Sequence, residues 1–315
     1  MIIEVPKNTR RKFGWGGKRK DSAEQVIQAA EELREFWPLT LRQLYYRLVA
    51  SGAIPNKKSA YKTLSELVKN MRKAEMLEWG SIEDRGRRVS AKLGFTSPEA
   101  FLEQELKSFL EGYSRCLVQE QRNHLELWIE KDALSQVFQP IADTYCIRTV
   151  ICKGFSSVTL LRNFYERASR ALERDQTPIV IYFGDLDPSG ISCLESLAVS
   201  LRDDFKLGDN VTFDRAGLNP DQVEKFALPT NLEALKKKDP RTPAYIEKFG
   251  ETAYELDAVH PKDLRELAIE AILRHSDTDK MYHHYSKQAT DREKLAKAKS
   301  WLNGRVEELR EILQD

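Results

Sequence analysis

The sequence is poor in cysteine, with four residues in 315, and no two of them form a C-x-x-C pair. This argues against a disulfide framework and a zinc site, and it makes a reducing cytoplasm the expected compartment. The chain also lacks an apolar run of about 18 residues. We therefore expect no membrane span. The basic stretch after Pro6 leads into no apolar segment, so no secretory signal is expected either.

A clear excess of one charge is also missing, since 50 Lys+Arg stand against 49 Asp+Glu and the formal net charge is +1. This balance hides a split along the chain. Residues 1–92 carry 20 basic and 11 acidic residues, whereas residues 93–315 carry 30 and 38. A net of +9 followed by −8 is typical of an anion-binding module joined to an acidic domain. The overall charge of +1 therefore does not exclude a nucleic-acid partner.

The N-terminal part is predicted to be a basic flexible arm at 1–21 followed by a helical module at 22–95. The arm either binds along the phosphate backbone of a nucleic acid or is a solvated tail with no specific role. Three helices are expected in the module, and capping-box patterns at Ser22 and Thr40 mark the starts of the first two. A basic turn follows the third. This order predicts a winged helix-turn-helix that binds double-stranded DNA, although three-helix units also serve as protein-interaction modules. The expected DNA contacts are Lys62, Lys69, Lys73, Arg85, Arg87 and Arg88.

Two adjacent tyrosines in the second predicted helix face different ways. Helical spacing places Tyr45 with the apolar face and Tyr46 on the flank shared with Arg42, four residues earlier. An arginine beside a tyrosine favours the phenolate and can hold a phosphate oxygen, which a tyrosine nucleophile needs. From spacing alone, a packed aromatic side chain is the simpler interpretation of Tyr46.

The second part of the chain alternates strands with helices, which predicts an α/β fold with a mainly parallel sheet. Apolar strands end just before Glu130 and just before the Asp185-Leu186-Asp187 segment. Because functional crevices lie beyond the carboxyl ends of parallel strands, these carboxylates are expected at one edge of the sheet. Oxygen ligands without a nearby histidine or cysteine cluster favour Mg²⁺. The alternative is that the aspartates only end a strand or cap a helix.

These motifs together resemble those of the topoisomerase VI A subunit family, which includes the related meiotic double-strand-break protein. The resemblance rests on Glu130-Lys131, Lys153-Gly154 and Asp185-x-Asp187-Pro-x-Gly190, which are similar to the family's Toprim motifs, and on Arg42-Gln43-Leu44-Tyr45-Tyr46, which is similar to its tyrosine motif. It implies a winged helix-turn-helix followed by a Rossmann-like Toprim domain. We therefore expect the Toprim domain at 121–290, after a connecting helix at 96–120. The amphipathic spacing of the tail separately predicts a C-terminal helix at 291–315.

The resemblance also implies residue roles. Tyr46 would attack a DNA phosphodiester, with Arg42 steadying the phosphate or the phenolate. Glu130, Asp185 and Asp187 would hold Mg²⁺, with Glu130 also a candidate for proton transfer. Lys153 would contact the DNA backbone, and Glu255 and Asp257 are further acidic candidates. In this family the tyrosine of one subunit meets the metal of the other, which implies a homodimer.

Three functions remain open from the sequence. The first is Mg²⁺-dependent DNA cleavage through Tyr46 by a compact, bacterial or mobile-element version of this family, which would need a separate ATPase subunit for strand passage. The second is a Toprim nuclease that uses water, similar to the Wadjet nuclease subunit JetD. The third is a non-catalytic DNA-binding subunit.

Overall fold

The computed structural model of the protein describes residues 14–83, 95–153, 157–236, 238–306, 308 and 311. The chain divides into two units. The helical unit comprises residues 1–85, 186–188 and 220–263, and the sheet unit comprises residues 86–185, 189–219 and 264–315. Residues 220–263, which were predicted to lie in the second domain, therefore group with the N-terminal helices.

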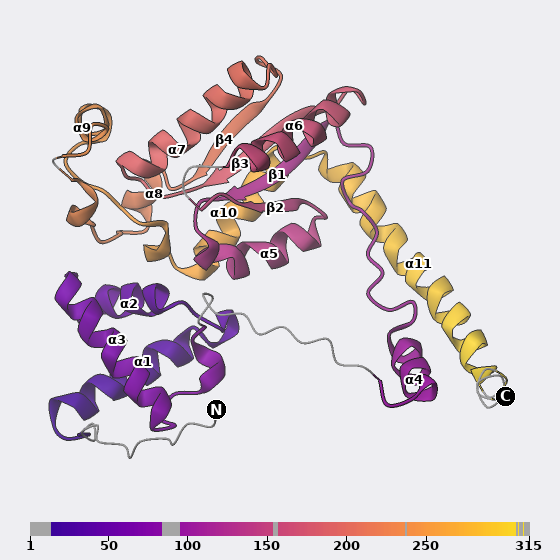
Figure 1. Ribbon diagram of the computed structural model, residues 1–315, viewed down its shortest axis with the longest axis horizontal. Coiled ribbons are helices and arrows are strands. Elements are labelled where there is room, and N and C mark those ends of the chain that lie inside the picture. Colours follow the sequence, from indigo (N-terminus) through magenta and orange to yellow (C-terminus); the bar gives the residue numbers. More distant parts are fainter. Residues whose placement is uncertain are drawn as a thin grey trace, which may run out of the picture. The chain divides into compact units, whose positions relative to one another are not determined.

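The helical unit contains three consecutive helices and several shorter elements (Figure 1). Apolar residues three and four positions apart on the three helices form one buried core, as the side chains of Val26, Leu44 and Leu64 show. The elements are α1 (Lys18–Glu32), α2 (Leu41–Ala50), α3 (Lys58–Lys73), α8 (Pro220–Lys225), α9 (Thr242–Phe249) and the 3-10 turns Arg34–Phe36, Trp79–Ser81, Leu232–Ala234 and Leu256–Ala258.

The sequence predicts the start of α2 correctly and the start of α1 incorrectly. At α2 the predicted capping box is confirmed, because Gln43 N donates to Thr40 Oγ1 at 3.2 Å and Thr40 N donates to Gln43 Oε1 at 2.8 Å. At α1 the prediction is wrong, since the helix already begins at Lys18. Ser22 lies inside it, where its hydroxyl donates to the Lys18 carbonyl at 2.8 Å.

The sheet unit is built on four parallel strands in the order β2-β1-β3-β4. This confirms the predicted α/β class and the parallel sheet. The strands are β1 (Asn123–Ile129), β2 (Arg148–Ile151), β3 (Thr177–Phe183) and β4 (Thr212–Gly217). The first three lie where the apolar runs predict them, whereas β4, which follows the short π-helical turn Ser200–Asp204, was not predicted.

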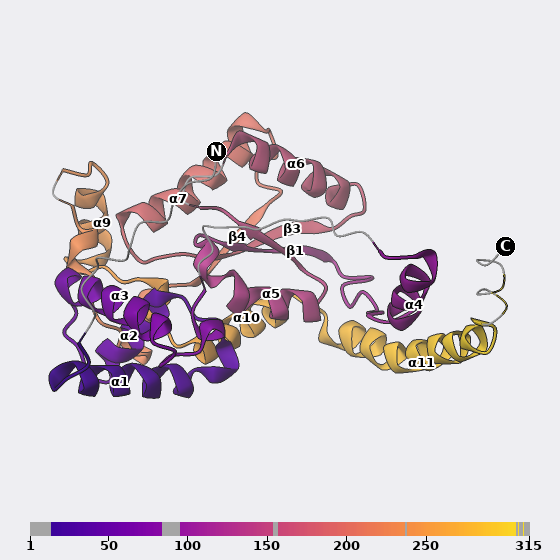
Figure 2. The same cartoon turned by 60° about the horizontal axis from the view of Figure 1, so that its bottom comes forward.

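Helices cover both faces of this sheet (Figure 2). On one face lie α6 (Val158–Leu172) and α7 (Pro188–Val199), and on the other lie α5 (Ser135–Thr144) and α10 (Pro261–Arg274). The side chains of alternate residues of β3 pack on opposite faces of the sheet. Tyr182 joins the core that includes Phe164 of α6, whereas the Phe183 ring lies 4.7 Å from that of Phe138 on α5. Burial on both faces explains why β3 is a continuous apolar run.

Two further helices, α4 (Pro98–Ser108) and α11 (Thr278–Asn303), complete the sheet unit. Lys299 on α11 donates to the Lys107 carbonyl at 2.7 Å, which ties the two helices together. The C-terminal helix was predicted to begin at 291, but α11 begins at Thr278, where the Asp277 side chain accepts a hydrogen bond from Lys280 N. Within the described part of the chain, no helix has both the length and the apolar composition that crossing a membrane requires.

Candidate functional site

The carboxyl ends of β1 and β3 bring two acidic residues together. The strands pair in register through Ile129 and Phe183, and Glu130 N donates to the Phe183 carbonyl at 2.9 Å. One residue beyond Gly184, Asp185 N donates to Glu130 Oε2 at 3.0 Å. Both carboxylates are buried. The parallel pairing thus places Glu130 and Asp185 side by side although 55 residues separate them.

Two glycines leave space for these carboxylates. A Cβ added to Gly184 would lie 2.6 Å from Glu130 Oε2. A Cβ added to Gly190 would overlap the Asp185 carbonyl oxygen and lie 3.0 Å from Glu130 Oε2. Real Cβ atoms essentially never come within 3.0 Å of another heavy atom, because atoms repel each other inside their van der Waals contact distance. Any larger residue at 184 or 190 would therefore displace the backbone or Glu130.

Basic side chains offset the buried negative charge. Lys131 Nζ lies 2.7 Å from Asp185 Oδ2. The Arg215 guanidinium donates to the backbone carbonyls of Asp185 and Gly184 at 2.5 and 3.1 Å, which fixes the turn after β3. The sequence assigned no role to Lys131 or Arg215. Lys131 could have been noticed because it directly follows the strand-terminal Glu130, whereas Arg215 lies on the strand that was not predicted.

The three predicted metal ligands divide between the two units. Glu130 and Asp185 belong to the sheet unit. Asp187 belongs with Leu186 and Pro188 to the helical unit, and it directly precedes α7. Across the residues that the structure describes, no group of three or more His, Cys, Asp or Glu side chains is arranged to hold a metal ion. Of the three predicted ligands, Glu130 and Asp185 thus lie in the sheet unit.

Lys153 follows β2 at the same edge of the sheet as the carboxylates. Its backbone has φ +50°, and its ammonium group lies 3.3 Å from Asp132 Oδ2 with most of the side chain exposed. Gly154, the second residue of the predicted Lys-Gly turn, lies outside the described residues. Lys153 therefore offers a positive charge close to the strand ends.

Tyr46 and Arg42 lie on α2 in the helical unit. Tyr46 is buried, with 6% of its surface exposed, and so is Tyr45 at 5%. The two rings meet edge to face at 5.2 Å, and Tyr45 makes a similar contact with Tyr61. The prediction of a packed Tyr45 is confirmed. Tyr46 is as deeply buried, although helical spacing alone placed it on a flank.

Arg42 is anchored by an acidic residue of the later segment. Arg42 Nη1 lies 2.5 Å from Glu255 Oε2, and Asn231 Nδ2 donates to Glu255 Oε1 at 2.6 Å. Burial lowers the pKa of Arg42, but the negative charges of Glu255 and Asp257 outweigh burial and raise it overall. The guanidinium is therefore a fixed positive charge four residues before Tyr46 on the same helix.

A cavity of about 350 Å³ adjoins Tyr46 inside the helical unit. Its lining includes Arg47 and Lys225 together with Asp257 and His260, so both basic and acidic side chains line it. Burial lowers the pKa of His260, whose ring lies edge-on to Phe36 at 5.7 Å. The 220–263 segment thus covers the flank of α2 that carries Tyr46, and it leaves a small polar space there.

The predicted DNA contacts on α3 are exposed. Lys62, Lys69 and Lys73 all lie on the solvent side of the helix, opposite the buried Leu64 and Met71. Lys69 also pairs with Glu66 at 2.9 Å. The predicted wing residues Arg85, Arg87 and Arg88 lie outside the described residues, as does most of the 1–21 arm.

Comparison with known proteins assigns the chain to no family. No protein-family model and no curated protein matches the chain.

Proposed function

We propose that this protein is a Mg²⁺-dependent DNA-cleaving enzyme of the type IIB topoisomerase A class, with a winged helix-turn-helix and a Toprim domain. The observation that carries the proposal is the hydrogen bond from Asp185 N to Glu130 Oε2 at the ends of adjacent parallel strands. Catalytic crevices of parallel sheets form at this edge. The fixed Arg42 beside Tyr46 is the second support, because a tyrosine nucleophile requires a nearby positive charge.

The residues at the sheet edge fit Mg²⁺. Their donors are carboxylate oxygens, and Gly184 and Gly190 let the backbone pass close to the Glu130 carboxylate. Protein-bound Mg²⁺ commonly uses only one or two carboxylates together with substrate phosphates and water, so the Glu130–Asp185 pair suffices. Asp187 would be the third ligand. When bound, the ion would supply positive charge to the phosphate oxygens of the DNA.

The proposed reaction is a transesterification at a DNA phosphodiester. Tyr46 Oη attacks the phosphorus and the bond to the 3′ oxygen breaks, which leaves a 5′-phosphotyrosyl bond and a 3′ hydroxyl. The proton that Tyr46 loses goes to water, and the proton that the 3′ oxygen gains comes from water, with Glu130 the candidate residue that relays it. Arg42 stabilises the phenolate by charge. Contacts to the DNA backbone are assigned to Lys62, Lys69, Lys73, Arg85, Arg87, Arg88 and Lys153.

One observation favours a second candidate, in which water is the nucleophile. Only 6% of the Tyr46 surface is exposed, so the residues around it have to move before much of the side chain can meet a phosphodiester. A metal-activated water needs no such movement. In that case Tyr46 is a core residue of the helical unit, and cleavage depends on the Glu130–Asp185 pair without the tyrosine.

A plasmid-cleavage assay separates these functions. The wild type, Tyr46→Phe and Glu130→Ala are each incubated with supercoiled plasmid and Mg²⁺, and products are resolved with and without proteinase digestion. The transesterase requires both residues, and proteinase is needed to release the broken DNA. The water nuclease requires Glu130 alone. If no divalent metal supports cleavage while DNA binding remains salt-sensitive, the protein is a non-catalytic DNA-binding subunit.

We further propose a homodimer in which Tyr46 of one copy acts together with the Glu130–Asp185 pair of the other copy. Any strand passage would require a separate ATPase subunit. Mixing Tyr46→Phe with Glu130→Ala tests this arrangement. A mixed dimer then has one complete site, formed by Tyr46 of one subunit and Glu130 of the other, and it nicks DNA that neither variant cuts alone. If each subunit cuts with its own tyrosine, the mixture stays inactive.

A further inference from the structure

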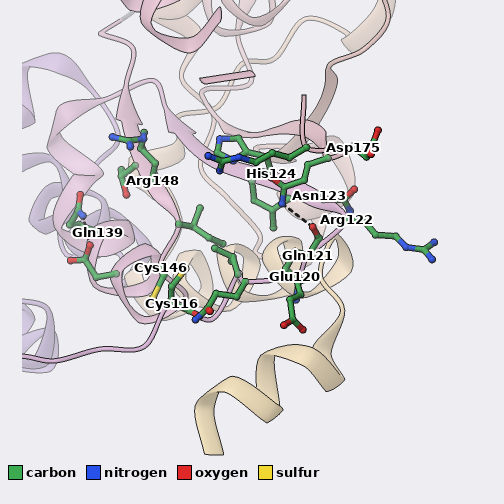
Figure 3. A pocket seen from close by; sticks show the side chains of 18 residues that line it. Cys116, Glu120, Gln121, Arg122, Asn123, His124, Gln139, Cys146, Arg148 and Asp175 are labelled. Atoms are coloured by element: carbon green, nitrogen blue, oxygen red, sulfur yellow. Dashed lines mark hydrogen bonds between the residues drawn. The ribbon is translucent and has the colours of Figure 1, made fainter. Parts of the chain in front are cut away.

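A cleft of about 970 Å³ lies at the amino-terminal ends of the strands, opposite the edge that carries Glu130 and Asp185 (Figure 3). Its walls come from the connector between α4 and β1, the turn between α5 and β2, and the residues just before β3. Two of the four cysteines, Cys116 and Cys146, lie in this lining. This cleft plays no part in the proposed cleavage reaction.

The two cysteines are neighbours in the cleft, because the Cys146 thiol acts directly on the Cys116 thiol, and Figure 3 labels both. The Cys146 thiol donates to the carbonyl of Arg115 at 3.4 Å, and Ser114 Oγ is 3.9 Å from its sulfur. The connector thus passes directly over the Cys146 sulfur, and Cys116 is the next residue along it. Cys116 is exposed and Cys146 is half-buried, so reagents can reach the pair.

The backbone at Cys146 has a conformation that is uncommon for a residue with a side chain. Its φ is +58°, in the left-handed region where glycine is least strained. This residue ends the turn between α5 and β2, a position that glycine often fills. The chain instead has a cysteine whose sulfur points at the connector.

We propose that Cys116 and Cys146 form a reversible disulfide bond when the protein meets a low-molecular-weight disulfide such as oxidised glutathione. The Cys116 thiolate attacks the glutathione disulfide, which forms a mixed disulfide and releases one glutathione thiolate. The Cys146 thiolate then attacks the Cys116 sulfur, which forms the protein disulfide and releases the second glutathione. The two protons given up by the cysteines are taken up by the two glutathione products, so that each oxidised glutathione yields two reduced molecules.

The bond would tie the α4–β1 connector to the α5–β2 turn. The connector is already held to α11, because Arg115 Nη1 pairs with Asp291 at 2.7 Å and Arg115 N donates to Gln288 at 2.7 Å. Oxidation would therefore join three elements of the sheet unit, namely α11, the connector and the turn after α5. It would also close a loop between residues 30 positions apart, which limits the freedom of the unfolded chain.

The thiol chemistry sets a pH dependence for this reaction. Partial removal of the thiol from water raises the pKa of Cys116, and the neighbouring Cys146 raises it further. Less of Cys116 is therefore ionised at neutral pH than of an ordinary cysteine. Since the thiolate is the attacking form, oxidation should be slow at neutral pH and faster at alkaline pH.

The test uses the full-length protein with oxidised glutathione, followed by alkylation, non-reducing digestion and mass spectrometry. We expect a linked Cys116–Cys146 peptide, loss of both alkylatable thiols, and recovery of both with reduced glutathione. The Tm of the oxidised protein should rise by roughly 5–10 °C. Cys152 and Cys193 are buried and act as internal controls that stay unmodified in the folded protein.

Cys146→Ser supplies the matched variant, because it removes only the resolving thiol. It should stop at the mixed disulfide and accumulate glutathione on Cys116. The proposal is overturned if wild-type protein also keeps glutathione on Cys116, if Cys116 links two chains instead, or if both thiols stay alkylatable at alkaline pH. None of these outcomes depends on whether the protein cleaves DNA.

Discussion

Arg42 of α2 and Glu255 form an ion pair of 2.5 Å across 213 positions of the sequence. Asn231 holds the second oxygen of the same carboxylate, so Glu255 is fixed from two sides. The pair ties the 220–263 segment to the helix that carries Tyr46. It is one of the contacts that group this segment with the N-terminal helices, and it fixes the positive charge that the proposed reaction uses.

Glu255→Gln tests the strength of this pair, because it keeps the shape of the side chain and removes its charge. We expect the free energy of unfolding to fall by about 1–2 kcal/mol, since a charged hydrogen bond becomes neutral while Arg42 keeps partial access to water. Urea denaturation measures the change. The control is Glu233→Gln, whose exposed pair with Lys58 spans 3.4 Å and should contribute less than about 0.5 kcal/mol. Equal effects of the two substitutions would contradict this prediction.

A second prediction concerns Glu126, a buried carboxylate on β1 that accepts hydrogen bonds from Arg167 at 2.6 and 2.9 Å. Burial raises the pKa of Glu126, but the bonds from Arg167 and those from His124 and Trp128 outweigh burial and leave the pKa below the ordinary value of a glutamate. The folded pKa is thus lower than the unfolded one. This contribution to stability is therefore present above about pH 4.5 and is lost as the pH falls through the folded pKa.

Arg167→Met should remove this stabilisation and leave an unpaired buried charge. The expected loss at pH 7 is about 3–5 kcal/mol, with a shallower decline in acid than the wild type shows. The free energy of unfolding between pH 3 and pH 7 measures both effects. Arg162→Met is the control, because its pair with Glu166 lies on the surface. A decline in acid as steep as that of the wild type would contradict the assignment to Glu126.

A third prediction concerns Gly190, which packs against the Asp185 carbonyl and Glu130. Gly190→Ala should lower the free energy of unfolding by about 1–3 kcal/mol through overpacking, and it should impair metal-dependent cleavage by displacing Glu130. Gly80→Ala is the control, since a Cβ there meets no atom within 4 Å. Denaturation curves and the plasmid assay report the two effects. A Gly190→Ala protein with unchanged stability would contradict the packing described here.

A fourth prediction concerns the exposed lysines of α3. Replacing Lys62, Lys69 and Lys73 by glutamine should weaken DNA binding to all sequences alike. It should also reduce the slope of log K against log salt by about 0.9 for each phosphate that the variant no longer neutralises. Binding is measured by fluorescence anisotropy at several salt concentrations. The control replaces the exposed lysines Lys287, Lys294 and Lys297 of α11 and should leave the slope unchanged. If both variants behave alike, α3 does not contact DNA.

The sequence predicts the strand-end carboxylates well, because parallel strands share an edge and apolar runs mark where strands end. The meeting of Glu130 and Asp185 follows from that rule alone. The capping box at Thr40 is equally local, and the structure confirms it. The start of α1 is not marked by Ser22, because the residues from Lys18 onward already form helix without a side-chain cap.

Contacts between distant segments could not be predicted in this way. Helical periodicity describes one face of α2, but it does not show that residues 220–263 cover the flank with Tyr46. The same limit applies to the pair of Arg42 and Glu255. It also applies to Cys116 and Cys146, whose thiols lie close together although β1 and α5 separate them in the sequence. Such pairs depend on the path of the chain, which a single sequence does not reveal.

The most direct test of the central claim is the search for a covalent protein–DNA link. The protein is incubated with duplex DNA labelled at its 3′ ends and with Mg²⁺, denatured with detergent and separated by gel electrophoresis. We predict label migrating with the wild-type protein through a 5′-phosphotyrosine at Tyr46, and no such label with Tyr46→Phe, Glu130→Ala or chelator. Cleavage by Tyr46→Phe at the wild-type rate, with no labelled protein in any sample, would contradict the claim.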